Sequence, residues 1–243
     1  MSQGYSEIFI KKSAEELKDF CRQREEKNRQ RIHAISDIIS KYLGKELKGL
    51  SVLEYGCNTG AAIKEFALLG NRCVGVDVFK EVIDIALATY GDIPQLTFTK
   101  IEERLPFPDK TFDFVFSSET IEHVPLNKRK LYLTEFRRVM KDDGCGYISY
   151  PNFWFPVETH YFIPFHHWLQ RIFPGKGLIY EDIPSKFQLR KELSRYFCWR
   201  DVSSDFLHSH YVLAYYPKIK VLLARLLSKT PFSIQDYLLL QPK

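Results

Sequence analysis

Between residues 50 and 150, short apolar runs alternate with longer segments of helical spacing, and this alternation limits the folds open to the chain. The runs that read as strands are SVLEY (51–55), RCVGVDV (72–78), LTFT (96–99), FDFVFS (112–117) and GCGYISY (144–150). The segments with helical spacing are 61–70, 80–91 and 128–140. Strands alternating with helices of ten or more residues are typical of βαβ units. The sequence therefore predicts an α/β fold with a doubly wound, mostly parallel sheet.

The flanking segments predict additional elements. Residues 13–43 have helical spacing, and the mixed charges from Lys18 to Arg31 indicate a solvated helix face. Asp142-Asp143-Gly144 predicts a turn before the fifth strand. The segment 151–185 is rich in proline, histidine and aromatic residues and interrupts the alternation of strands and helices. We interpret it as an inserted lid. After it we expect a helix at 187–196, a strand from Trp199 to Leu207, a helix at 219–227 and a last strand at 236–241.

These elements suggest four parts of the chain. We expect an N-terminal helical cap at 1–48, a ligand-binding core at 49–150, an aromatic lid at 151–186, and C-terminal elements at 187–243 that complete the sheet. At 243 residues the chain is long enough to bury one large core.

Composition limits the cellular compartments and the binding partners that we expect for the protein. The net charge of +5 is mild, so it permits an anionic partner without requiring one. Five scattered cysteines without a CxxC pair favour a reducing compartment. The N-terminus has no apolar signal region, and no run approaches the ~20 apolar residues of a spanning helix. We expect a cytoplasmic protein, with a peripheral position on the inner face of a membrane as a second option.

The turn LEYGCNTG follows the first predicted strand. Gly56 and Gly60 have the spacing G-x-x-x-G, and Asn58 stands where a dinucleotide-binding loop has its middle glycine. Glu54 at the strand end would repel a diphosphate and suits a positively charged group. A tight strand-to-helix turn without a ligand fits the same residues.

Asp77 ends the second predicted strand, 17 residues after Gly60. An acidic side chain at this place can accept hydrogen bonds from two ribose hydroxyls, although a helix N-cap is the alternative. Together Glu54, Gly56, Gly60 and Asp77 describe a pocket for a nucleoside with a cationic amino-acid tail.

Four blocks in order resemble the class I S-adenosylmethionine-dependent methyltransferases, in the group of small-molecule and ubiquinone-type enzymes. The blocks are VLEYGCNTG, VGVDV, ERLPFPDKTFDFVFSSETIEHV and LTEFRRVMKDDGCGYISYPN, within residues 50–152. The resemblance implies a Rossmann-like sheet of seven strands, S-adenosylmethionine as cofactor, S-adenosylhomocysteine as its product, and no metal.

The resemblance also implies roles for individual residues. Glu54 would hold the ammonium of the cofactor, and Asp77 its ribose hydroxyls. Ile101 stands where many relatives have an aspartate for the adenine amino group, so either the neighbouring Glu102 or a backbone carbonyl would make this contact instead. Ser117 would face the cofactor near its sulfur. The cofactor-binding residues implied in this way are Glu54, Tyr55, Gly56, Cys57, Asn58, Gly60, Asp77, Val78, Phe79, Ile101, Glu102 and Ser117.

Methyl transfer is an in-line displacement, so a general base is needed only for some acceptors. His123 after the fourth strand is the first candidate, with a purely structural histidine as the alternative. His160 in the aromatic segment is a second candidate that would meet the acceptor.

Residues 148–168 resemble the region after the fifth strand in methyltransferases of glycans and glycolipid intermediates. This similarity implies a small-molecule acceptor such as a sugar or a lipid-linked intermediate, and peripheral membrane contact through the lid. The aromatic residues can equally form the lid's own small core.

Two other functions fit parts of the sequence. An RNA-modifying methyltransferase would use the basic residues between Arg22 and Arg31, but acidic residues interleave with them and the net charge is low, so a nucleic-acid partner is disfavoured. A non-catalytic cofactor-binding protein would keep the fold without turnover, and the intact glycines and Asp77 argue against it.

Overall fold

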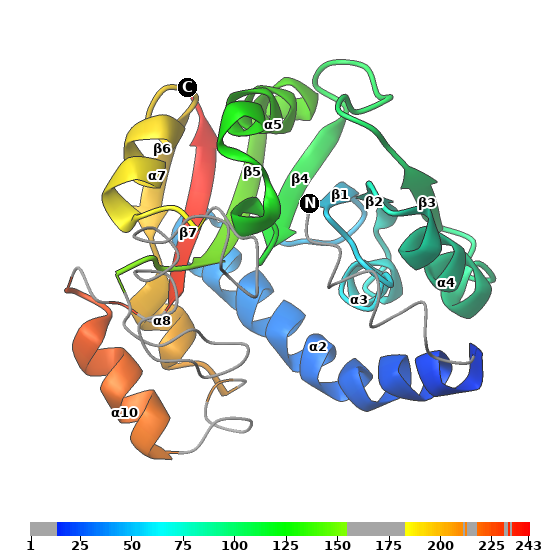
Figure 1. Ribbon diagram of the computed structural model, residues 1–243, viewed down its shortest axis with the longest axis horizontal. Coiled ribbons are helices and arrows are strands. Elements are labelled where there is room, and N and C mark those ends of the chain that lie inside the picture. The colour runs from blue at the N-terminus through cyan, green and yellow to red at the C-terminus, as the bar shows by residue number, and fades with distance from the viewer. Residues whose placement is uncertain (1–13, 155–182, 211, 213–217, 231–232, 234) are drawn as a thin grey trace, which may run out of the picture.

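The fold is known from a computed structural model that describes residues 14–154, 183–210, 212, 218–230, 233 and 235–243. It contains a seven-stranded sheet in the order β3-β2-β1-β4-β5-β7-β6, with helices on both faces (Figure 1). Neighbouring strands from β3 to β5 are parallel, whereas β7 runs antiparallel to both β5 and β6. The predicted doubly wound, mostly parallel, Rossmann-like sheet of seven strands is confirmed.

The elements have the following bounds. The strands are β1 (Ser51–Tyr55), β2 (Arg72–Asp77), β3 (Leu96–Lys100), β4 (Phe112–Ser118), β5 (Met140–Pro151), β6 (Phe197–Asp201) and β7 (Gln235–Pro242). The described helices are α2 (Ala14–Leu43), α3 (Ile63–Leu68), α4 (Lys80–Tyr90), α5 (Leu126–Val139), α7 (Lys186–Leu193), α8 (Ser203–Leu207) and α10 (Lys218–Leu227), with a 3-10 turn η1 (Ile121–His123).

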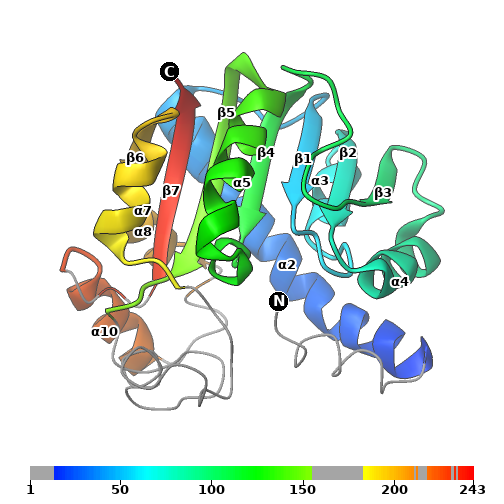
Figure 2. The ribbon, with the colours of Figure 1, turned by 45° about the horizontal axis from the view of Figure 1, so that its top comes forward.

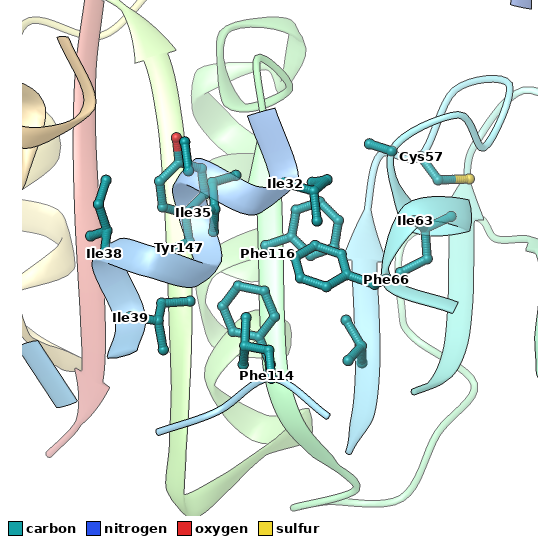
Figure 3. Packing of buried hydrophobic residues seen from close by; sticks show 14 of the residues in the cluster. Ile32, Ile35, Ile38, Ile39, Cys57, Ile63, Phe66, Phe114, Phe116 and Tyr147 are labelled. Carbon is teal, nitrogen blue, oxygen red and sulfur yellow. The ribbon is translucent and has the colours of Figure 1, made fainter. Parts of the chain in front are cut away.

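One face of the sheet is covered by α2, α3, α4, α8 and α10. Ile32, Ile35 and Ile39 recur at helical spacing along α2 and lie in the same core as Phe114 and Phe116 of β4 (Figure 3). Because these isoleucines are at most 1% exposed, the middle of α2 is part of the main core.

The other face is covered by α5 and α7. Leu133 and Phe136 of α5, with Leu189 of α7, pack in one cluster with Val115 of β4 and Ile148 of β5. Alternate residues of β4 therefore point into two different cores. Burial on both faces explains why the central strands read as continuous apolar runs.

Two sequence-based expectations are wrong. Asp142-Asp143-Gly144 is not a turn between elements, because β5 begins at Met140 and runs through these residues with an irregularity in its pairing to β4. The strand predicted from Trp199 to Leu207 ends at Asp201, and α8 begins at Ser203. Asp201 accepts a hydrogen bond from the Ser203 N–H, 3.0 Å away, which favours a helix start at this point.

Most of the predicted lid lies outside the described residues, because residues 155–182 are not described. The boundaries proposed for the four parts of the chain remain predictions. Within the ranges given above, no helix has both the length and the apolar character needed to cross a bilayer.

Candidate functional site

A cavity of about 340 Å³ lies at the carboxyl ends of β1, β2 and β4. β1 pairs with β2 on one side and with β4 on the other, so the chain winds in opposite directions from this point (Figure 2). Open α/β sheets bind ligands at such a topological switch point. The lining residues come from α2, the loop after β1, the end of β2, the loop after β3, and the segment from β4 into α5.

The loop after β1 is fixed to the end of β2. The N–H groups of Gly56 and Cys57 both donate to the carbonyl of Val76, at 2.9 Å. Gly56 has φ +87°, and a Cβ there would lie 2.3 Å from Thr120 Cγ2, so only glycine lets the loops after β1 and β4 approach each other.

Glu54 is the carboxylate at the closed end of the cavity. It is 3% exposed, and its Oε2 accepts a hydrogen bond from the Ile63 N–H at 3.0 Å, in the first turn of α3. Burial raises the pKa of Glu54 to about 8, while the positive charge of Arg31 and the Ile63 N–H act in the opposite direction. A second cationic group in the cavity would therefore favour the ionised form of Glu54.

Asp77 lies across the loop from Glu54. Its two carboxylate oxygens accept hydrogen bonds from the N–H of Asn58, at 2.9 Å, and the N–H of Phe79, at 3.1 Å. Burial raises the pKa of Asp77, and these backbone donors oppose the shift. The N-cap residue of α4 is Phe79, so Asp77 is not the N-cap of that helix. Its hydrogen bonds instead orient the carboxylate at the cavity wall.

The far wall contains two stacked tyrosines and the end of β4. The rings of Tyr55 and Tyr132 lie 4.1 Å apart between centroids, and the Tyr132 hydroxyl donates to Ser117 Oγ at 2.6 Å. Ser117 is 1% exposed and does not line the cavity, whereas Ser118 does. The buried Ser118 Oγ has no hydrogen-bond partner among the described residues. A buried hydroxyl without a partner is costly, so Ser118 is suited to contact a ligand.

The cavity brings together most of the residues expected from the sequence. Those that line it are Glu54, Tyr55, Gly56, Cys57, Asn58, Asp77, Val78, Phe79, Ile101, Glu102 and His123. Gly60 does not line it: with φ +80°, a Cβ there would lie 2.5 Å from the ring of Phe98. The space that Gly60 leaves is thus filled by the protein's own core. His160 lies outside the described residues.

Sequence reasoning missed the contribution of α2. Lys27, Asn28 and Arg31 are half-buried and line the cavity, which the expectation of a solvated face did not include. A signal was present, because Asn28 and Arg31 continue the buried stripe of Ile32 and Ile35 by one turn toward the N-terminus. Other lining residues not expected from the sequence are Thr59, Ala61, Ala62, Val82, Glu103, Ser118, Glu119, Thr120, Val124, Pro125, Lys128, Leu131 and Tyr132.

The charges of the lining residues favour a ligand with a cationic part. Five carboxyl groups line the cavity (Glu54, Asp77, Glu102, Glu103 and Glu119) against three basic side chains (Lys27, Arg31 and Lys128). Lys128 pairs with Glu103 at 2.6 Å near the surface. Among the residues in view, no cluster of three or more histidine, cysteine or acidic side chains is arranged to hold a metal ion.

Comparisons with known proteins agree with this geometry. Residues 53–148 match the family model described as a methyltransferase domain. The chain is 31% identical over 115 residues to the mitochondrial ubiquinone biosynthesis O-methyltransferase of Rattus norvegicus, which covers 45% of this chain and 33% of the relative. It is 26% identical over 148 residues to the ubiquinone biosynthesis O-methyltransferase of Pelagibacter ubique, covering 52% of this chain and 59% of that protein. The chain thus spans less than two thirds of the length of these relatives.

Solved structures share the fold at low sequence identity. A SAM-dependent methyltransferase from Aquifex aeolicus superposes with a TM-score of 0.56 at 18% identity, over 79% of this chain and 93% of that chain. The [4+2]-cyclase SpnF superposes with a TM-score of 0.53 at 20% identity, over 86% of this chain and 80% of that chain. Residues 53–148, which supply most of the lining of this cavity, are thus similar to a methyltransferase domain, and the chain shares its fold with a solved SAM-dependent methyltransferase.

Proposed function

We propose that the chain transfers a methyl group from S-adenosylmethionine to a hydroxyl or amine of a small molecule. The observation that carries this proposal is the placement of Glu54 and Asp77. The buried Glu54 and the half-buried Asp77, at the ends of adjacent strands, line one cavity at the switch point of a methyltransferase-type sheet. A sulfonium nucleoside with an amino-acid tail has cationic and hydroxyl groups that match them.

The cavity offers a partner for each part of this cofactor. Glu54 and Arg31 interact electrostatically at the closed end, and they match the ammonium and carboxylate of the methionine part. The oriented carboxylate of Asp77 would accept hydrogen bonds from the ribose hydroxyls. Val78 and Ile101, which line the cavity and belong to an apolar cluster, would pack on the adenine ring.

The acceptor would enter beside the end of β4. Ser118 and His123 line this side of the cavity, and the partnerless Ser118 hydroxyl would contact the acceptor or the methyl group in transit. Two relatives are named O-methyltransferases, which supports a hydroxyl as the nucleophile. A hydroxyl loses a proton during transfer, and His123 would accept it as general base. A sugar or a lipid-linked intermediate is the finer proposal for the acceptor.

Replacing Asp77 tests the cofactor site. Asp77→Asn keeps the shape but removes the charge, and we expect it to weaken S-adenosylmethionine binding by about 1.5–3 kcal/mol, roughly 10- to 150-fold. Titration calorimetry on the purified chain measures this. Asp84→Asn, on the exposed side of α4, is the matched control and should bind as the unmodified chain does. Equal affinity of the Asp77 variant and the control would remove the ribose role.

Replacing His123 tests the catalytic step. We expect His123→Ala to lower kcat by about 100-fold or more, while the affinity for S-adenosylmethionine stays within about twofold. The assay follows labelled methyl transfer to a panel of small phenols, sugars and amines. His33→Ala, an exposed histidine of α2, is the control. A His123 variant with full kcat would leave this residue without a catalytic role.

Turnover is the decisive measurement for the enzyme assignment. The cyclase SpnF has the same fold, so cofactor binding alone does not distinguish a methyltransferase from a protein that kept the fold for another purpose. If the chain binds S-adenosylmethionine but releases no S-adenosylhomocysteine with any acceptor of the panel, the non-catalytic alternative replaces our proposal.

A further inference from the structure

Helix α10 (Lys218–Leu227) presents large apolar side chains to the outside. Leu222, Leu223 and Leu226 are 54%, 46% and 66% exposed. Val221 and Ala224, on the opposite side of the helix, are 3% and 8% exposed and belong to the main core. The helix is therefore anchored by one face and leaves a row of leucines uncovered on the other.

The charged residues that neighbour these leucines in the sequence are all positive. Lys218 is exposed and lies about one turn before Leu222 on the same side of the helix, and Lys229 is exposed in the turn that follows the helix, three residues after Leu226. The sequence has no acidic residue from 206 to 235, a stretch that also contains Lys220 and Arg225. Arg225 donates to the carbonyl of Leu207, so α10 is fixed against the end of α8.

The uncovered face lies at the same end of the sheet as the cavity. The loop after α10 is fixed at the carboxyl end of β5, because Ser228 accepts a hydrogen bond from Lys186 Nζ and Ser233 accepts one from Asn152, which follows β5. Gln235, the first residue of β7, donates to Glu119, which lines the cavity. Figure 2 shows α10 near the end of the sheet at which β7 begins.

We propose that α10 docks the protein on the surface of an anionic lipid bilayer, with Leu222, Leu223 and Leu226 inserted between the headgroups. Lys218 and Lys229 lie at the two ends of this leucine row, where they contact the negatively charged headgroups. Docking of this kind keeps the helix parallel to the membrane plane and brings the cavity end of the sheet toward the lipid. The inference goes beyond methyl transfer and stands without it.

A second copy of the chain fits this face less well than a lipid surface. Two α10 helices paired around a two-fold axis would bring their leucines together but would also gather their exposed lysines. The helix has no acidic residue to pair with those lysines. An anionic bilayer offers an apolar interior to the leucines and negatively charged headgroups to the lysines.

Vesicle sedimentation with the full chain tests the proposal and needs neither cofactor nor acceptor. We expect binding to vesicles of phosphatidylcholine mixed with phosphatidylglycerol, and at least about tenfold weaker binding to phosphatidylcholine alone. Leu222→Ser/Leu226→Ser should reduce partitioning by about tenfold or more. Lys218→Glu/Lys229→Glu should reduce it by at least about fivefold for each lysine, and added salt should weaken binding of the unmodified chain.

Matched controls distinguish docking through α10 from non-specific binding to the vesicles. Leu68→Ser/Leu87→Ser removes two leucines that are 58% and 46% exposed on α3 and α4, and Lys48→Glu reverses an exposed charge elsewhere. All controls should sediment with anionic vesicles as the unmodified chain does. Equal loss in controls and α10 variants, or no binding to anionic vesicles, overturns the proposal. A dimer in solution that the α10 leucine variants dissolve overturns it in favour of a second copy.

Discussion

Glu54 is buried, yet the role that we propose for it needs a charged side chain. Its pKa is raised to about 8 by burial, so near pH 7 most unliganded molecules hold a proton on this side chain. Unfolding returns the pKa of Glu54 to its ordinary value of 4.5, so the native state binds more protons than the unfolded state between these two values. The contribution of Glu54 to the free energy of unfolding therefore falls as the pH rises from 4.5 to about 8.

Binding of the cofactor should consequently release a proton. An ammonium group near Glu54 favours the carboxylate, so we expect close to one proton to be released per cofactor bound near pH 7, and affinity to rise between about pH 6 and pH 7.5. Titration calorimetry in two buffers of different ionisation enthalpy measures the release. Glu54→Gln should bind more weakly and release no proton. Identical heats in both buffers for the unmodified chain would contradict the ammonium contact.

At the level of secondary-structure elements, α7, β6 and β7 are held together by buried charges. Lys186 Nζ lies 3.1 Å from Asp236, and their side chains are 7% and 0% exposed. Arg190 pairs with Asp201 at 2.5 Å and approaches Asp236 at 3.6 Å. Lys186 also donates to Ser228, so the same cluster fixes the loop that follows α10.

Removing the positive charge of Lys186 from this cluster should lower the free energy of unfolding. We expect Lys186→Met to lower the free energy of unfolding by about 3–5 kcal/mol, because Asp236 remains buried with less compensation. The double variant Lys186→Met/Asp236→Asn should recover part of the loss. Chemical denaturation measures both, and Lys80→Met, in an exposed pair with Asp84, should cost about 0–1 kcal/mol. A Lys186 variant as stable as the Lys80 control would show that the cluster contributes little.

For the molecule as a whole, β7 closes the sheet from the far end of the sequence. It lies between β5 and β6, and Leu238, Leu239 and Leu240 are at most 2% exposed. These leucines belong to both cores, one on each face of the sheet. The sheet therefore stays incomplete until residues 235–242 pair with a strand about ninety positions earlier.

Removing β7 should abolish cooperative folding. Deletion of residues 235–243 exposes the edges of β5 and β6 and opens both cores, so we expect loss of the near-ultraviolet circular dichroism and a broad unfolding transition. Deletion of Lys243 alone is the control and should keep the cooperative transition. A truncated chain with a sharp transition would show that the parallel strands form a stable unit without β7.

Features that depend on neighbouring residues could be predicted from the sequence. Strand and helix periods, the glycine turn after β1 and the acid at the end of β2 are encoded in short windows, because backbone stereochemistry and alternation act locally. The resemblance in these windows predicted the fold and the part of the cavity wall formed by the loop after β1 and the end of β2. The turn expected at 142–144 is instead an irregularity within β5, between the pairs Phe112–Met140 and Phe114–Cys145, and these long-range pairs lie outside any short window of sequence.

Features that depend on contacts between distant segments were decided by the tertiary structure. The buried stripe of α2 indicates which face of the helix carries Arg31, but the packing of α2 on the sheet decides that this face lines the cavity. Ser118 rather than Ser117 faces the cavity because side chains alternate along β4, and its pairing with β1 and β5 decides which set points to the ligand. The chain thus specifies its elements through local stereochemistry, whereas packing over long sequence distances decides which side chains meet at the site.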